Sequence, residues 1–281
     1  MENIFATAIG SLKHLKNHPI LFLPGIVYPF LIVFLSLVFG VFSIFLPASN
    51  LLLSAAVSVF SLFLTAILLF FTTAGLIGAA GQTVRFGSTS FSDVIRYGRK
   101  FCLRLALASV FIWALRSLSA FFWAPVIRLF FDSEYTAAFV IETLKTDPLL
   151  LLPLFEILGP TALSALFLSS AYFILISFMF YFVSFIIVID NKSVFKSYRE
   201  SFSLLKKRPI RVVSFVFLMT LVRVLFVLLL LISAAAFLYL QIPPIIGLIF
   251  QSAASVFFTA FTTVWITRFY IILTRQKTAD I

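Results

Sequence analysis

Two arginines that lie inside apolar runs are the residues best placed to do chemistry. Arg116 and Arg223 each follow another arginine, Arg104 and Arg211, by 12 residues, which is about 18 Å along a helix. If the earlier arginine of each pair marks the membrane surface, the later one lies past the bilayer midplane. An intramembrane arginine is costly unless it is paired or hydrated, and is a candidate for function. We therefore predict an intramembrane site for an anion, such as a lipid phosphate or a small carboxylate.

A structural role for the same two arginines is the alternative. Each guanidinium could extend toward the membrane surface, or it could pair with Glu142, Glu156 or a partner subunit. Both interpretations remain open at the level of sequence.

Residue types suited to catalysis are scarce. His14 and His18 are the only histidines, and although their i, i+4 spacing can hold a metal, the only nearby acid is Glu2. No nucleophile–base arrangement follows from two histidines near the N-terminus. Glycines at 75, 78 and 81 match no phosphate-binding loop and instead favour close helix packing in lipid. We expect no enzyme activity, no metal site and no cofactor.

The composition indicates a membrane protein. Hydrophobic residues make up 62% of the chain and charged residues only 11%, against about a quarter charged in soluble domains. Several apolar runs reach the roughly 20 residues that cross a bilayer. The net charge of +11 comes from clusters beside these runs, so it predicts contact with membrane rather than nucleic acid. A single cysteine, Cys102, excludes an internal disulfide.

An all-α fold with six membrane spans follows from these runs. A less apolar insert, residues 129–160, separates the third span from the fourth and could hold a short helix at 135–145. The predicted spans are 19–46, 51–80, 102–124, 161–189, 210–240 and a sixth that ends near 273.

Three amphipathic segments, 3–18, 91–101 and 190–209, precede spans and should lie in the membrane surface. Their apolar faces are expected to comprise Phe5, Ala8, Leu12 and Leu15 in the first and Phe195, Tyr198, Phe202 and Leu205 in the third. The basic residues expected to contact anionic headgroups are Lys13, Lys16, Arg96, Arg99, Lys100, Lys196, Arg199, Lys206, Lys207 and Arg208.

The distribution of basic residues predicts the orientation. Only Arg116, Arg128, Lys145 and Arg223 lie in span interiors or on the other side, which leaves 17 of the 21 Lys and Arg residues beside one membrane face. Because basic residues favour the inside, both termini are predicted to be cytoplasmic.

An internal repeat agrees with this layout. Phe5, Ser11, Leu15, Lys16, Pro19 and Ile20 recur as Phe195, Ser201, Leu205, Lys206, Pro209 and Ile210, and Asp93, Arg99, Lys100, Arg104 and Arg116 match Glu200, Lys206, Lys207, Arg211 and Arg223. The pattern predicts one membrane domain over 1–281, built from three parallel units at roughly 3–82, 88–190 and 191–273. Each unit is a surface helix followed by a transmembrane hairpin.

The run from Phe185 to Lys206, with an acidic-polar turn at Asp190 and a central Ser201, resembles a prokaryotic family. It is similar to the glycerophosphodiester phosphodiesterase membrane domains and their uncharacterised six-span relatives, as is the turn from Gly87 to Asp93. The resemblance implies a multi-pass protein of a prokaryotic cytoplasmic membrane. Because no soluble phosphodiesterase domain accompanies these motifs, it implies no catalysis.

Two functions remain possible on this basis. The first is a non-enzymatic transport or lipid-handling component, with Arg116 and Arg223 at its site. The second is a structural or assembly protein that acts through partners and has no substrate. The expected partners are a bilayer with anionic headgroups and either another membrane protein or a second copy of the chain.

Overall fold

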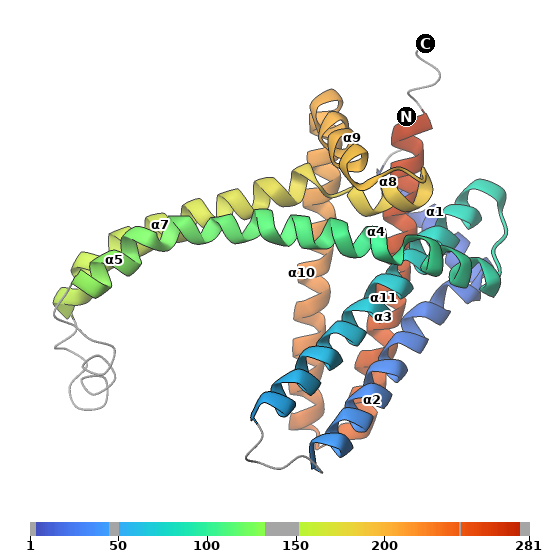
Figure 1. The fold of residues 1–281 in the computed structure, drawn as a ribbon. Coiled ribbons are helices and arrows are strands. Elements are labelled where there is room, and N and C mark those ends of the chain that lie inside the picture. Colours follow the sequence, from blue (N-terminus) through green and yellow to red (C-terminus); the bar gives the residue numbers. More distant parts are fainter. Residues whose placement is uncertain (1–3, 45–50, 133–151, 242, 276–281) are drawn as a thin grey trace. The chain divides into compact units, whose positions relative to one another are not determined.

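The computed structural model describes residues 4–44, 51–132, 152–241 and 243–275. Every regular element in these ranges is a helix, so the predicted all-α fold is confirmed for the described part of the chain (Figure 1). The chain divides into two compact units, each described by itself. The larger unit comprises Met1–Ala108 and Tyr181–Ile281, and the smaller unit comprises Ser109–Phe180. The predicted single domain and its repeat boundaries stay predictions.

Six helical stretches are long and apolar enough to cross a membrane, as predicted. The third is longer than expected and begins at Phe91 instead of 102. The six stretches are Pro19–Val41, Ala55–Phe86, Phe91–Arg128, Pro160–Ile189, Pro209–Tyr239 and Ile245–Thr274.

The larger unit is a bundle in which α3 packs against α2 and α11, and α11 also contacts α1 and α10 (Figure 1). Its elements are α1 (Ile4–Asn17), η1 (Pro19–Phe22), α2 (Leu23–Ile44), α3 (Leu51–Phe86), most of α4 (Phe91–Ser117), α8 (Val183–Ile189), α9 (Val194–Lys207), α10 (Pro209–Tyr239) and α11 (Pro244–Arg275).

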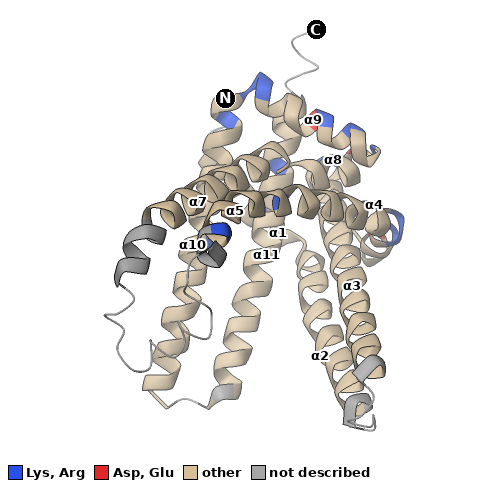
Figure 2. Ribbon diagram, turned by 60° about the vertical axis from the view of Figure 1, so that its left-hand side comes forward, with Lys and Arg blue, Asp and Glu red and all other residues tan. Residues whose placement is uncertain are grey.

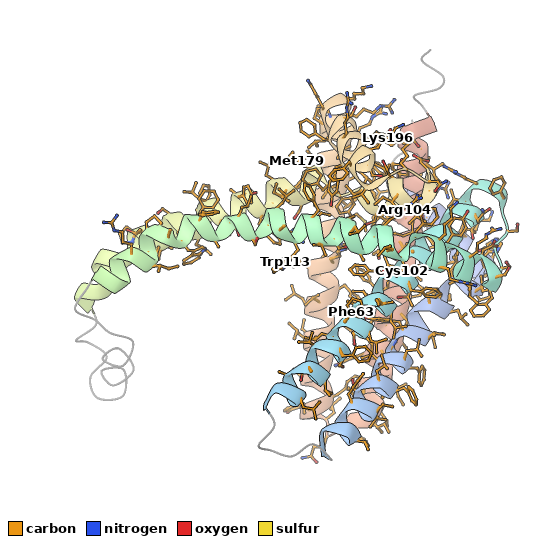
Figure 3. All side chains as sticks on the ribbon, in the orientation of Figure 1. Phe63, Cys102, Arg104, Trp113, Met179 and Lys196 are labelled. Carbon is orange, nitrogen blue, oxygen red and sulfur yellow. The ribbon has the colours of Figure 1, made fainter. Side chains whose placement is uncertain are left out.

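A small core holds this bundle together. Buried leucines of α1, η1 and α3 meet small residues of α3 and α11 there, including Ala79, Ala80 and Ala260. Outside the core, large apolar side chains cover the outer helix faces, and Phe63 of α3, which is 61% exposed, projects from one of them (Figure 3). Such a surface is stable only against lipid, because exposed apolar patches of this extent are unfavourable in water.

Prolines decide where the surface helices end. Pro19 starts η1 after α1, and Pro209 starts α10 after α9, because proline lacks an N–H and is favoured in the first turn of a helix. The middle segment has Cys102 at the corresponding position, and α4 continues without a break from Phe91 to Ser117. The predicted boundary between a surface helix at 91–101 and a span from 102 is therefore not a helix end.

Gly87 and a capping box form the turn between α3 and α4. Gly87 has φ +73°, a left-handed conformation that glycine adopts without steric cost. The backbone N–H of Ser90 donates to Asp93 Oδ2 at 3.0 Å, and the Asp93 N–H donates to Ser90 Oγ at 3.4 Å. This reciprocal pair is a capping box that fixes the start of α4.

Helices α1 and α9 each bury small hydroxyl residues together with part of the predicted apolar face. Thr7 and Ser11 in α1, and Ser197 and Ser201 in α9, are at most 2% exposed, and Leu15 and Tyr198 of the predicted faces are also buried. Other apolar side chains of the predicted faces are exposed, among them Phe5, Leu12, Phe195 and Phe202. Small hydroxyl residues suit the protein-facing side of these helices, because they donate hydrogen bonds to carbonyls of their own helix and let neighbouring backbones approach closely. The two helices begin and end 190 residues apart, but the three-unit repeat stays a prediction.

The smaller unit consists of the end of α4, η2 (Leu118–Trp123), α5 (Ala124–Asp132) and α7 (Leu152–Met179), with α7 packed on η2 and α5. Tyr172 Oη donates to the Leu115 carbonyl at 2.9 Å. The fourth predicted span, 161–189, is interrupted between α7 and α8, and no proline or glycine explains this break. The short helix expected at 135–145 lies outside the described residues.

Replacing Gly78 with alanine is expected to destabilise the larger unit by about 1–3 kcal/mol, the usual cost of overpacking. A Cβ at Gly78 would lie 2.1 Å from Cγ of the Tyr97 ring, so α3 and α4 would have to separate. Gly81→Ala is the matched control, because its Cβ would meet only Ile189 Cγ1 at 3.5 Å. Thermal unfolding in detergent measures the stability of both variants, and equal melting temperatures for Gly78→Ala and Gly81→Ala would contradict the prediction.

Candidate functional site

Arg116 lies near the end of α4 and makes its contacts with α7 inside the smaller unit. Its Nη2 donates to Ser177 Oγ at 2.9 Å, and its guanidinium carbon lies 4.4 Å from the centre of the Phe173 ring. Nε is buried and makes no hydrogen bond to the described residues. A hydroxyl and an aromatic face are neutral partners, so they leave the positive charge uncompensated. The predicted alternative acids, Glu142 and the side chain of Glu156, lie outside the described residues.

Arg223 lies in α10, within the larger unit. Its guanidinium carbon is 6.0 Å from the centre of the Tyr181 ring, at the outer limit of a cation–π contact. The Tyr181 hydroxyl is buried without a hydrogen-bond partner among the described residues. Arg116 and Arg223 thus belong to different compact units, and a shared site for both stays a prediction.

The predicted membrane-contact residues lie on α1, α4 and α9, all within the larger unit. Nine of the ten are exposed, and Arg208 is half-buried. Lys and Arg gather toward the end of the bundle where α9 lies, whereas the far ends of α2, α3, α10 and α11 have none (Figure 2). Lys196 projects from α9 at that end (Figure 3). On α4, a shallow hollow is lined by Ser92, Ile95, Arg96, Arg99 and Lys100.

Asp190 and Asn191 connect the turn before α9 to three helices of the larger unit. Asp190 accepts a hydrogen bond from the Tyr270 hydroxyl of α11. It also forms an ion pair with Arg85 of α3, whose Nη2 is 3.2 Å from Asp190 Oδ1. The next residue, Asn191, has φ +52° and accepts from Arg104 Nη1 of α4 at 3.1 Å. The turn before α9 is therefore attached to α3, α4 and α11.

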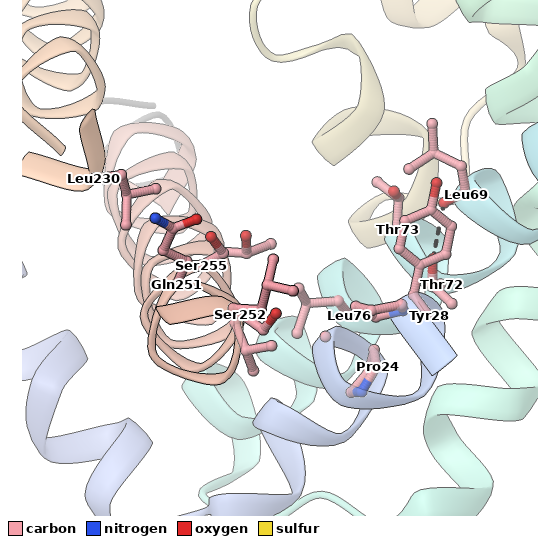
Figure 4. Close-up of a pocket in the computed structure, with 15 residues that line it drawn as sticks. Pro24, Tyr28, Leu69, Thr72, Thr73, Leu76, Leu230, Gln251, Ser252 and Ser255 are labelled. Carbon is pink, nitrogen blue, oxygen red and sulfur yellow. Dashed lines mark hydrogen bonds between the residues drawn. The ribbon is translucent and has the colours of Figure 1, made fainter. Parts of the chain in front are cut away.

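A cavity of about 510 Å³ lies between α2, α3, α10 and α11, all of the larger unit. Its volume falls within the range of small-molecule pockets, about 300–1,000 Å³. Gln251, Ser252 and Ser255 of α11 lie on one side, and Thr72 and Thr73 of α3 on another (Figure 4). The other lining residues are Pro24, Gly25, Tyr28, Pro29, Leu69, Leu76, Leu230, Leu248, Val256 and Thr259.

Counted along the sixth candidate span, the cavity lies near the middle of the helix. Ser255 is ten residues beyond Ile245, where the sixth span begins, which is about 15 Å along the helix. That is half of the roughly 30 Å hydrocarbon thickness. Leu69 and Leu248 at its edge are 42% and 63% exposed, so the cavity borders the lipid-facing surface.

The reasoning from sequence missed this cavity, although part of its signal is local. Gln251, Ser252, Ser255 and Thr259 lie at i, i+1, i+4 and i+8, which puts four polar groups on one face of an apolar helix. Thr72 and Thr73 of α3 are adjacent in sequence, and both line the cavity. The sequence pattern does not show which helices form the opposite wall of the cavity.

His14 of the predicted histidine pair lies on α1 and is half-buried. Burial and then the nearby Arg268 lower the pKa of His14 below its usual value of 6.5, because both disfavour the charged form. Among the described residues, no group of three His, Cys, Asp or Glu side chains is close enough to hold a metal.

Six apolar helices of spanning length and a cavity among four of them define a multi-pass α-helical membrane protein. Within this class the chain belongs to the family described as a domain of unknown function, DUF7847, whose model matches residues 2–273. No curated protein and no solved structure matches it. The predicted likeness to glycerophosphodiester phosphodiesterase membrane domains stays a prediction.

Proposed function

We propose that the protein is a non-enzymatic lipid-handling component of the cytoplasmic membrane, with both termini on the cytoplasmic side. The observation that carries this proposal is the cavity between α2, α3, α10 and α11, which lies at membrane depth and borders the lipid-facing surface. Its mixed lining of leucines, hydroxyls and one amide suits a molecule with an apolar and a polar part.

The cavity differs from the site predicted at sequence level, because neither Arg116 nor Arg223 is among its lining residues. The basic ends of α1, α4 and α9 support the proposed orientation, since cytoplasmic surfaces carry the excess of Lys and Arg. Their charges would hold the same end of the bundle against anionic headgroups.

A cavity-filling variant tests the proposal. Ser255→Trp is expected to abolish retention of lipid by the purified full-length chain, because the indole would occupy the space between α11 and α3. Leu62→Trp is the matched control: it adds the same side chain on α3 at a position that is 71% exposed. Native mass spectrometry after detergent exchange gives the number of lipids retained per protein.

Retention in wild type and Leu62→Trp, with loss in Ser255→Trp, would support lipid handling. Equal retention by all three proteins, or none in wild type, would overturn it. Co-purification of a membrane partner with all three proteins in either of those cases would favour the structural or assembly role.

A further inference from the structure

We infer that the cavity selects an uncharged amphiphile, a lipid whose head offers hydroxyl or ester groups, and rejects anionic lipids. This inference rests on the proposed lipid-handling function and names its substrate class.

The first argument is charge. None of the 15 residues that line the cavity is Asp, Glu, Lys, Arg or His. A charged headgroup at this depth would lose its hydration without gaining a counter-charge, which is strongly unfavourable in a low-dielectric site. The basic residues of the bundle gather instead toward its α9 end (Figure 2). The cavity and the basic surface therefore differ in the headgroups that they can accept.

The second argument is hydrogen-bonding capacity. In the described part of the chain, the side chains of Tyr28, Gln251, Ser252 and Ser255 make no hydrogen bond to the protein. Polar groups left unpaired at membrane depth are unfavourable, so a ligand that pairs with them gains affinity. Together they offer hydroxyl and amide donors as well as oxygen acceptors, which suits a head that both donates and accepts.

The third argument comes from the proline inside helix α2. Pro29 lies inside α2 and has no N–H, so the carbonyl of Gly25, four residues earlier, lacks its helical donor. Both residues line the cavity. A freed carbonyl is an additional acceptor for a ligand hydroxyl, and it repels an anion.

The apolar lining completes the match. Leu69 and Leu76 of α3 and Leu248 of α11 line the cavity among these polar groups, and Leu69 and Leu248 are exposed. An acyl chain can follow these leucines outward into the bilayer while the head stays among the α11 hydroxyls. The expected ligand is therefore a lipid that enters sideways from the membrane.

Two probes with the same acyl chains test the inference. Dioleoylglycerol has a free hydroxyl head, and dioleoyl phosphatidic acid adds only the phosphate. Native mass spectrometry of the full-length protein, titrated with each, is expected to show at least tenfold tighter binding of dioleoylglycerol at the site that Ser255→Trp blocks. Gln251→Leu should weaken dioleoylglycerol binding about tenfold and leave binding of phosphatidic acid unchanged, because one paired amide is lost. Thr220→Val, a polar-to-apolar change on α10 outside the cavity, is the control.

The outcomes separate the two proposals. If phosphatidic acid binds as tightly as dioleoylglycerol and Ser255→Trp abolishes both, the protein handles lipid but the substrate class is wrong. If neither probe binds wild type, the lipid-handling function itself fails. Should Gln251→Leu not fold, Ser255→Ala removes a single hydroxyl from the same wall, and the comparison of probes on wild type needs no variant.

Discussion

Replacing Asp190 with alanine is expected to lower the free energy of unfolding by about 2–3 kcal/mol, the loss of charge-assisted hydrogen bonds from a site with two donors. The change removes the acceptor for the Tyr270 hydroxyl and the partner of Arg85 at once. Tyr270 is 1% exposed, so its hydroxyl has no easy access to water in place of Asp190. Solvent screening limits the ion-pair share, because the Arg85 and Asp190 side chains are 34% and 22% exposed.

Titration with a denaturing detergent measures this loss, and a double-mutant cycle with Tyr270→Phe apportions it. Tyr270→Phe alone should cost about 1 kcal/mol and should cost nothing further in the Asp190→Ala background. Glu200→Ala is the comparison, since it breaks only the ion pair with Lys192 and should cost below about 1 kcal/mol. Similar losses in Asp190→Ala and Glu200→Ala would show that Asp190 does not join the helices.

Arg116→Met is expected to weaken binding of an anionic headgroup by about 10- to 150-fold, the range for one charged hydrogen-bonding group of about 1.5–3 kcal/mol. The smaller unit should stay folded, because Ser177 and Phe173 are neutral partners and methionine removes a charge that is unfavourable in lipid. Arg116→Lys should restore only part of the affinity, since lysine keeps the charge but lacks the planar fork. A titration of the purified chain with a short-chain phosphatidic acid measures these affinities.

Ser177→Ala separates an anion site from a structural contact. It removes the neutral partner of Arg116 and leaves the guanidinium free to bind an anion. If Arg116→Met and Ser177→Ala both unfold the smaller unit, or if Arg116→Met binds phosphatidic acid as wild type does, the predicted anion site is wrong. Arg223→Met, measured in parallel, reports whether the second predicted arginine contributes.

The number and position of the spans follow from sequence because hydropathy is a local property. Each helix must satisfy its own backbone hydrogen bonds in lipid, so a sufficiently long apolar run is enough to predict it. The capping box at Ser90 and Asp93 was equally predictable, since its partners are three residues apart. Which residues of α1 and α9 face the protein was not predictable, because hydrophobic periodicity shows which side of a helix is apolar but not whether that side meets protein or lipid.

The membrane class, the six candidate spans and the clustering of basic residues follow from the sequence, because they depend on composition and on spacing within about 20 residues. The tertiary structure brings Asp190 to Arg85 and Tyr270, which are 105 and 80 residues away. It alone placed Tyr28, Thr72 and Ser255 around one cavity. The physical reason is that these neighbours result from helix packing. Within a membrane, helix packing depends on the fit between small residues and aromatic rings, such as Gly78 against Tyr97. No local sequence pattern encodes that fit.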